Sequence, residues 1–387
     1  MIHLRGMSWD HPRGHDSVVA AAAAFMRTTP GVSISWQTRS LQDFADSPIE
    51  HLAETFDVVL LDHPFMGFAA ASGCLLPVEH HLDAAFLADQ AANSVGPSHR
   101  SYGYGGHQWA LATDAAAQVS AYRPDLLERI GADVPRSWPA VLGLARSRAN
   151  EATARVAMPL IPVDTLMGFC SLCGHTGEEP FVDPERAVGR ATGRHALETL
   201  RALKRAAHPE STTWNPIRTY DRMGTTDEVA YVPLAFGYSN YARPGFRPHV
   251  IQFTNIPAAG EGVPRGGILG GVGLAVSAST KHPAEAFAYA RFVADPETQR
   301  GVFFRAGGQP GHRAAWLDPA VNAASSNFFL DTLETLDHAY LRPRYLGWMP
   351  LQDVAGALLH RFLTADGAID ATLDALDTLY RASRRDP

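Results

Sequence analysis

Two short loops of the same composition hold the first candidates for chemistry. Residues 9–14 and 62–65 each contain the triplet Asp-His-Pro, and the first loop adds Arg13. Carboxylate and imidazole groups exchange hydrogen bonds or protons with polar ligands, and an arginine pairs bidentately with a carboxylate. Alternatively, Asp10 and Asp62 could only cap the helices that follow them. The candidates in this part of the chain are Asp10, His11, Arg13, Asp62, His63 and, farther along, Asp114.

A second group of candidates combines aromatic rings with polar groups. Residues 236–241 (Phe-Gly-Tyr-Ser-Asn-Tyr) follow an apolar run and offer Phe236, Tyr238 and Ser239. Aromatic faces suit sugars and planar ligands alike. Tyr345 and Trp348 lie in a segment that also contains Arg342 and Arg344, which would favour an anionic ligand. Core packing under a helix is the alternative for Trp348.

The cysteines and histidines do not predict a metal or cofactor site. Cys170 and Cys173 have the C-x-x-C spacing of redox and zinc sites, but there is no second C-x-x-C, and their surroundings resemble a buried apolar helix. Adjacent histidines, as at residues 80–81, cannot both face one metal in a strand, and the loop with His11 and His15 contains Pro and Gly. We therefore expect no metal and no cofactor.

Composition excludes several classes of protein. The 387 residues carry 33 Lys+Arg against 40 Asp+Glu, a net charge of −7, which argues against a nucleic-acid binder. No apolar run approaches the ~18 residues of a membrane-spanning helix. The first residues look like a strand and lack the pattern of a secretory signal. Either the chain is cytoplasmic, or a signal was removed before this numbering begins.

The first third of the chain alternates strands and helices. Strand patterns cover residues 2–9, 32–37 and 57–62, and helical spacing covers residues 17–26 and 41–56. This order predicts a parallel sheet with helices on its faces. Ligands of such sheets lie beyond the carboxyl ends of the strands, where both Asp-His-Pro loops occur.

The rest of the chain predicts a second α/β unit that begins near residue 119. Residues 102–106 are Gly-rich but lack the context of a phosphate loop, so a hairpin is expected. Residues 156–161 and 229–236 resemble strands, and residues 266–277 resemble a strand with many glycines, which permits close backbone approach or a bend. Helices are expected at residues 122–131, 137 onward, 187–207, 283–294, 296–305, 328–339, 351–363 and 369–383.

The order of these motifs resembles the extracellular solute-binding proteins of ABC importers, in particular the carbohydrate-binding family that includes maltose-binding protein. Residues 9–14 with Pro30–Trp36 are similar to the first strand, helix and "PGVKV"-type second strand of that family, and residues 57–62 to its "PDI/V" strand. Residues 109–114, 122–127 and 135–139 look like the crossover into the second lobe. Residues 270–277, 281–297 and 307–311 resemble the passage that ends in a "G-x-x-P" turn.

This resemblance implies a two-lobed α/β fold, of the type II periplasmic-binding-protein class, in which hinge closure binds a small solute in a cleft. Lobe one would comprise residues 1–115 and 270–315, and lobe two residues 116–269 and 316–387. The implied function is non-catalytic binding of a sugar-like or carboxylated solute by a monomer that, if exported, delivers the solute to an ABC permease from the periplasm. The alternative is a cytoplasmic enzyme on the same scaffold, with Cys170 as nucleophile and Asp or His groups as acid and base.

Overall fold

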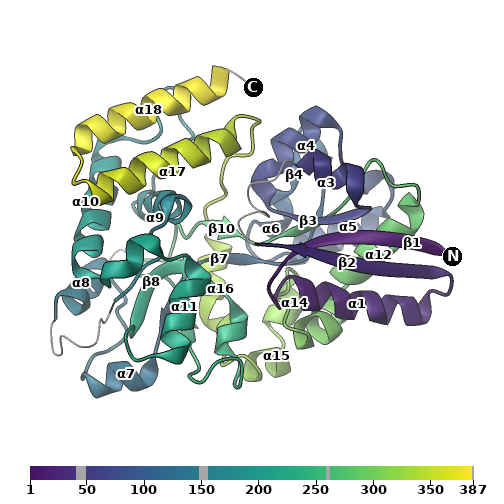
Figure 1. Ribbon diagram of the computed structural model, residues 1–387, viewed down its shortest axis with the longest axis horizontal. Coiled ribbons are helices and arrows are strands. Elements are labelled where there is room, and N and C mark those ends of the chain that lie inside the picture. The colour runs from purple at the N-terminus through teal and green to yellow at the C-terminus, as the bar shows by residue number, and fades with distance from the viewer. Residues whose placement is uncertain (41–48, 148–155, 259–261, 386–387) are drawn as a thin grey trace. The chain divides into compact units, whose positions relative to one another are not determined.

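The computed structural model describes residues 1–40, 49–147, 156–258 and 262–385 (Figure 1). Part of the helix expected over residues 41–56 lies outside these ranges. The chain forms two compact units. Unit 1 comprises Met1–Ala116, Gly270–Asn322 and Arg344–Leu346; unit 2 comprises Ala117–Leu269, Ala323–Pro343 and Gly347–Pro387.

Unit 1 is built on a mixed sheet with the strand order β2-β1-β3-β11-β6. β1 is parallel to both β2 and β3, as the alternating sequence pattern predicts, and β11 is antiparallel to β3 and β6. The elements are β1 (Ile2–Trp9), α1 (His15–Thr28), β2 (Val32–Arg39), α3 (Ile49–Thr55), β3 (Val58–Leu61), η1 (His63–Phe65), α4 (Met66–Ser72), η2 (Val78–His80), α5 (Ala84–Asn93), α6 (Ser98–Ser101), β4 (Gly103–Tyr104), β5 (His107–Gln108), β6 (Leu111–Ala112), β11 (Gly273–Val276), α12 (Pro283–Ala294), α13 (Pro296–Thr298), η5 (Gln299–Phe303), α14 (Arg313–Trp316) and α15 (Pro319–Ala323), whose last residue is already in unit 2.

The core of unit 1 lies between this sheet and its helices. In Figure 1, α1 runs along one face of the strands, while α3 and α4 cover the other. The apolar stripe of α1 buries Val18 and Phe25 against sheet residues such as Leu4. Tyr289 of α12 then joins three elements: its hydroxyl accepts a hydrogen bond from Trp36 Nε1 (3.1 Å) and donates to the carbonyl of Val18 (2.9 Å). The short polar loops beyond the strands are thus held by a packed scaffold.

Unit 2 has a smaller sheet with the order β10-β7-β8, in which β9 also pairs with β7. Its elements are β7 (Ala116–Tyr122, which begins in unit 1), α7 (Pro124–Arg129), α8 (Trp138–Arg146), α9 (Pro162–His175), α10 (Arg190–Ala206), η3 (Pro209–Thr213), α11 (Pro216–Thr225), β8 (Tyr231–Phe236), η4 (Ser239–Ala242), β9 (Gln252–Thr254), β10 (Leu269–Gly270), α16 (Phe328–Asp337), α17 (Trp348–Thr364) and α18 (Ile369–Arg385).

Helix α9 is the central helix of unit 2, packed against α10 and α17 (Figure 1). Its side chains from Asp164 to His175 are all buried. Ser171 connects this helix to the sheet, because its hydroxyl donates to Gln118 Oε1 (2.6 Å) and accepts from the backbone N–H of Ile268 (3.1 Å).

Two expected strands differ in the structure. Residues 156–161 form only an isolated bridge, Val156 to Tyr231, because Pro159 and Pro162 remove backbone donors from this segment and Leu160 N–H bonds to Ser211 and Trp214 instead. The Gly-rich strand over 266–277 is divided into β10 and β11 by Gly271. Its φ of +95° and its close approach to the carbonyl of Asp114 leave no room for a side chain.

The expected hairpin and several expected helices are confirmed. β4 and β5 pair antiparallel around Gly105 and Gly106, and Ser137 accepts a hydrogen bond from Ala140 N–H (3.4 Å) as the N-cap of α8. Within the described ranges, none of the helices combines the length and apolarity needed to cross a membrane.

Candidate functional site

Three loops of unit 1 meet at one edge of its sheet. β1 and β3 are parallel, and β6 points the same way because β11 is antiparallel to both β3 and β6. The loops that follow these strands therefore leave the sheet at the same edge. They are residues 10–14, residues 62–65 and residues 113–114.

Arg13 and Asp114 form a bidentate ion pair across this edge. Arg13 Nε lies 2.7 Å from Asp114 Oδ2, and the Nη2 atom lies 2.5 Å from Oδ1. Both side chains are buried, at 4% and 2% exposure. Asp114 is held by its backbone N–H, which donates to the carbonyl of Val272 (3.0 Å). The pair thus joins the loop after β1 to the loop after β6, 101 residues away in sequence.

The electrostatics of Asp114 follow from opposing effects. Burial raises the pKa of this carboxyl, the Arg13 guanidinium acts against that shift, and the negative charge of Asp62 adds to it. The influence of Asp62 places a second carboxylate in electrostatic range of the pair. This edge therefore combines two carboxylates, a guanidinium and two imidazoles, which are groups able to donate hydrogen bonds to hydroxyl groups and to accept hydrogen bonds from them.

The Asp-His-Pro loops differ in what their side chains do. Asp62 caps η1 by accepting a hydrogen bond from the backbone N–H of His63 (2.8 Å), so the capping interpretation is correct here. It is wrong for Asp10: α1 begins after Gly14 and has no side-chain cap, and Asp10 is exposed. His11 Nδ1 accepts from the backbone N–H of Arg13 (3.1 Å), which shapes the first loop.

His63 is fully buried next to Asp62. Its Nδ1 lies 3.1 Å from Asp62 Oδ1, and its ring packs edge-on against Tyr102 at 6.3 Å between centroids. His63 can therefore orient the Asp62 carboxylate, and its contact with Tyr102 fixes the position of the loop.

The short segment Arg344–Leu346 places Tyr345 in unit 1. Arg344 Nη1 donates to three backbone carbonyls, those of Arg100 (2.7 Å), Ser101 (3.2 Å) and Gly103 (2.5 Å). The segment also lies so close to Gly67 of α4 that no side chain fits there. No sequence motif indicates this anchoring role, because all three acceptors are main-chain oxygens.

Three of the unit 2 candidates lie at the end of β8 or directly after it. Phe236 is the last residue of β8 and pairs with Gln118, while Tyr238 occupies the N-cap position of η4 and Ser239 begins this helix. Tyr238 is buried to 7% exposure and contacts Tyr220 and Tyr241 edge-on. Trp348, the first residue of α17, is fully buried and packs edge-on against Phe181 at 5.1 Å. For these residues, contact with a ligand stays a prediction.

The cysteine nucleophile considered for an enzyme is wrong. Cys170 and Cys173 lie in the middle of α9 with no exposed surface, as the apolar-helix interpretation predicts. Burial raises the pKa of Cys170 far above its ordinary value, so the thiol stays protonated. A nucleophilic cysteine needs access to substrate and a stabilised thiolate, and Cys170 has neither.

Comparison with known protein families shows to which family the chain belongs. The family model of bacterial extracellular solute-binding proteins matches residues 20–324. The chain belongs to this family. A search of curated proteins gives no match.

Solved structures of other solute-binding proteins share the fold of this family member over nearly its whole length. An ABC transporter solute-binding protein from Agrobacterium radiobacter K84, in complex with ribitol, has a TM-score of 0.83 at 18% identity and covers 98% of each chain. The maltose-bound MalE3 of T. maritima has a TM-score of 0.84 at 17% identity and covers 99% of this chain and 100% of its own. A solute-binding protein from Thermotoga lettingae TMO, bound with alpha-D-tagatose, has a TM-score of 0.84 at 15% identity with the same coverage. The mixed α/β fold is therefore that of the two-lobed sugar-binding proteins.

Proposed function

We propose that this protein is the solute-binding component of an ABC importer and that its solute is a neutral sugar or polyol. Membership of the solute-binding family supports the transport role. The ribitol, maltose and tagatose complexes of structurally similar proteins support the class of solute. The partner would be an ABC permease in the cytoplasmic membrane, which the binding protein would meet from the periplasm, and the binding protein would act as a monomer without catalysis.

We choose a neutral solute because three arginines that could bind a carboxylate already donate hydrogen bonds to acceptors of the protein itself. Arg13, Arg342 and Arg344 are the residues that would favour a carboxylated ligand. Arg13 pairs with Asp114, Arg342 Nη1 donates to Gln352 Oε1 (3.1 Å), and Arg344 binds three carbonyls. A carboxylated solute would have to compete with these protein acceptors. A hydroxyl group needs no such exchange, because it both donates and accepts.

The candidate contacts in unit 1 are the side chains at the edge described above, among which Asp62 is a partly exposed acceptor. Its side chain is 30% exposed, whereas those of Arg13 and Asp114 are almost completely buried. Aspartate oxygens accept hydrogen bonds from sugar hydroxyls in the charge-assisted range of strength. The remaining proposed contacts are Asp10, His11, His63, Tyr345, Phe236, Tyr238, Ser239 and Trp348.

Calorimetric titration of the full chain tests this proposal. Ribitol, maltose and tagatose represent the neutral class, and galacturonate and citrate the carboxylated class. We expect saturable binding within the neutral class, with the ligand recovered unchanged by NMR. Binding of the carboxylated compounds alone, or conversion of a ligand, would refute the proposal.

A pair of matched substitutions tests the site. Asp62→Asn removes the charge but keeps a capping side chain, so the loop keeps its fold. We expect at least about tenfold weaker binding, equivalent to about 1.4 kcal/mol. Asp16→Asn, at an exposed aspartate in the first turn of α1, is the control and should leave affinity unchanged. Equal affinity of wild type and Asp62→Asn would exclude Asp62 from the site.

A further inference from the structure

A cluster of imidazole and carboxylate groups lies in unit 1 on elements other than the three loops at the sheet edge. Glu79 and His80 belong to η2, and His107 begins β5 in the hairpin that the sequence predicts. One ligand atom from each of the three side chains lies within 4.8 Å of the others. The cluster combines residues 27 positions apart, so the spacing of neighbouring histidines could not have indicated it.

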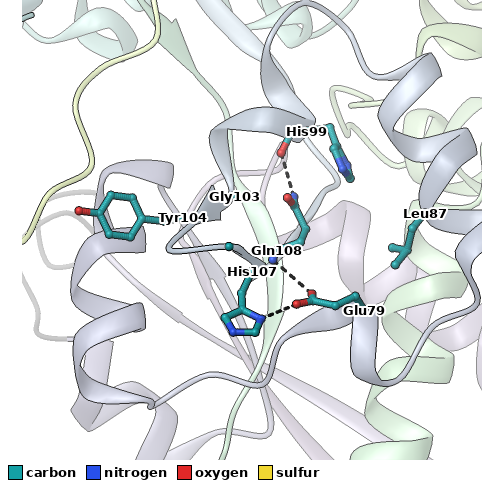
Figure 2. Close-up of a pocket in the computed structure, with 8 residues that line it drawn as sticks. Glu79, Leu87, His99, Gly103, Tyr104, His107 and Gln108 are labelled. Carbon is teal, nitrogen blue, oxygen red and sulfur yellow. Dashed lines mark hydrogen bonds and ion pairs between the residues drawn. The ribbon is translucent and has the colours of Figure 1, made fainter.

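The geometry of the cluster is held by hydrogen bonds from two sides. His107 Nδ1 lies 2.6 Å from Glu79 Oε1, and the backbone N–H of Gln108 donates to Glu79 Oε2 at 3.2 Å (Figure 2). The rings of His80 and His107 stand nearly perpendicular, with 5.6 Å between their centroids. Hydrogen bonds thus position Glu79 and His107, and the His80 ligand atom lies within 4.8 Å of theirs.

The hairpin gives His107 a defined position. Gly105 and Gly106 form its turn with φ values of +60° and +84°, and Tyr104 pairs with His107 across it. Trp109 Nε1 donates to the carbonyl of Tyr104 (3.0 Å), and the Trp109 ring packs edge-on against His107 at 5.4 Å. A preorganised ligand loses little conformational entropy when it binds.

The cluster borders a cavity of about 500 Å³. Glu79, His107 and Gln108 line it together with Leu87, His99, Gly103, Tyr104 and Gly106 (Figure 2). Two of the three cluster residues, Glu79 and His107, therefore border a space that leaves room for a further ligand, as in metal sites with an open position.

We propose that Glu79, His80 and His107 bind a divalent transition metal ion, with Zn²⁺ as the ion of best fit. Two imidazole nitrogens and one carboxylate oxygen form a ligand set that suits Zn²⁺ and its neighbours in the Irving–Williams order and that Mg²⁺ and Ca²⁺ do not prefer. The metal replaces the hydrogen bond between His107 and Glu79 and connects η2 to the hairpin. Water or a ligand in the cavity completes the coordination.

The test is calorimetric titration of tag-free, chelator-treated full chain with ZnCl₂, with MgCl₂ as the comparison ion. We expect one site for Zn²⁺, none of similar affinity for Mg²⁺, and a rise in melting temperature with Zn²⁺ because the metal binds only the folded state. The variants His80→Asn, His107→Gln and Glu79→Gln should each bind Zn²⁺ at least about tenfold more weakly.

The chain has 17 histidines, so a control must show that the loss of a histidine outside the cluster leaves zinc binding unchanged. His81→Asn is this control. This residue adjoins His80 but stacks on Phe287 at 4.3 Å, outside the cluster. It should bind Zn²⁺ like the wild type. The three ligands have solvent-accessible side chains, so the metal-free variants should melt like the wild type, and this measurement separates lost ligation from lost folding. Absence of a zinc site, or a site that the three variants leave intact, would overturn the proposal.

Discussion

The carboxyl group of Asp164 offers the sharpest test of the energetics of unit 2. Asp164 lies in the first turn of α9 with 3% exposure. Among the described residues, none donates a hydrogen bond to its Oδ2 atom. Burial raises its pKa from 3.8 to about 8. A charged aspartate near a helix N-terminus is ordinarily stabilised, so burial here outweighs the helix dipole.

The magnitude of the effect follows from proton linkage. At pH 7 the carboxyl is ionised in the unfolded chain but must be protonated in the folded one, which costs roughly 1.36 kcal/mol for each pH unit above 3.8, or about 4 kcal/mol. Because the folded pKa is the higher one, the penalty is absent below pH 3.8, grows as pH rises and levels off above about 8. Asp164→Asn has the shape of the protonated acid and carries no such penalty.

Urea unfolding of the full chain between pH 5 and pH 8 measures this difference. We expect Asp164→Asn to be more stable than the wild type, with an advantage that increases by about 1.4 kcal/mol per pH unit. Asp16→Asn is the control: this aspartate also lies in the first turn of a helix, but its side chain is 55% exposed, so its substitution should not give the gain in stability expected of Asp164→Asn. If the difference in unfolding free energy between Asp164→Asn and the wild type stayed constant over this pH range, the buried carboxyl would not have the raised pKa.

Three further predictions concern packing, burial and a buried charge. Gly67→Ala should lower the free energy of unfolding by about 1–3 kcal/mol, because the added methyl group meets the carbonyl of Arg344. Gly143→Ala, in the interior of α8 with open space around it, should raise the free energy of unfolding by about 0.5–1 kcal/mol. A gain in stability in both variants would refute the close contact at Gly67. Ellman's reagent should modify at most Cys74 in the native protein and all three cysteines in urea, because Cys74 is partly exposed; native reaction at Cys170 would contradict its burial. Arg123→Ala should destabilise the protein by about 1–3 kcal/mol in an unfolding assay, because two backbone carbonyls lose the donor that this buried guanidinium supplies. Its two carboxylate partners are about half exposed and remain hydrated, so they add little to the loss. An unchanged stability would show that the buried hydrogen bonds contribute nothing.

The order of elements was largely predictable because it rests on local patterns. The predicted bounds of the first strand are those of β1, and the 283–294 helix is α12 without change. The strand expected over residues 156–161 was wrong because apolar residues on both sides of Pro159 look like a strand, although Pro159 and Pro162 lack the backbone donors that a strand needs. The edge of the sheet was predictable too, since parallel strands place their carboxyl ends together.

The sequence alone determined the family, through the order of motifs along the chain, and the alternation of strands and helices, through local residue patterns. It left the role of Cys170 open, and the burial of this residue in α9 decided it. The tertiary structure alone decided which polar groups meet. The Arg13–Asp114 pair joins residues 101 positions apart, and Glu79 reaches His107 over 28. Such pairs depend on which loops leave the same edge of a sheet and on where a hairpin packs. The partners of a buried charge then decide whether it is compensated, as Arg13 is by Asp114, or penalised, as in Asp164, because the surrounding atoms and not the residue type set the cost of removing a charge from water.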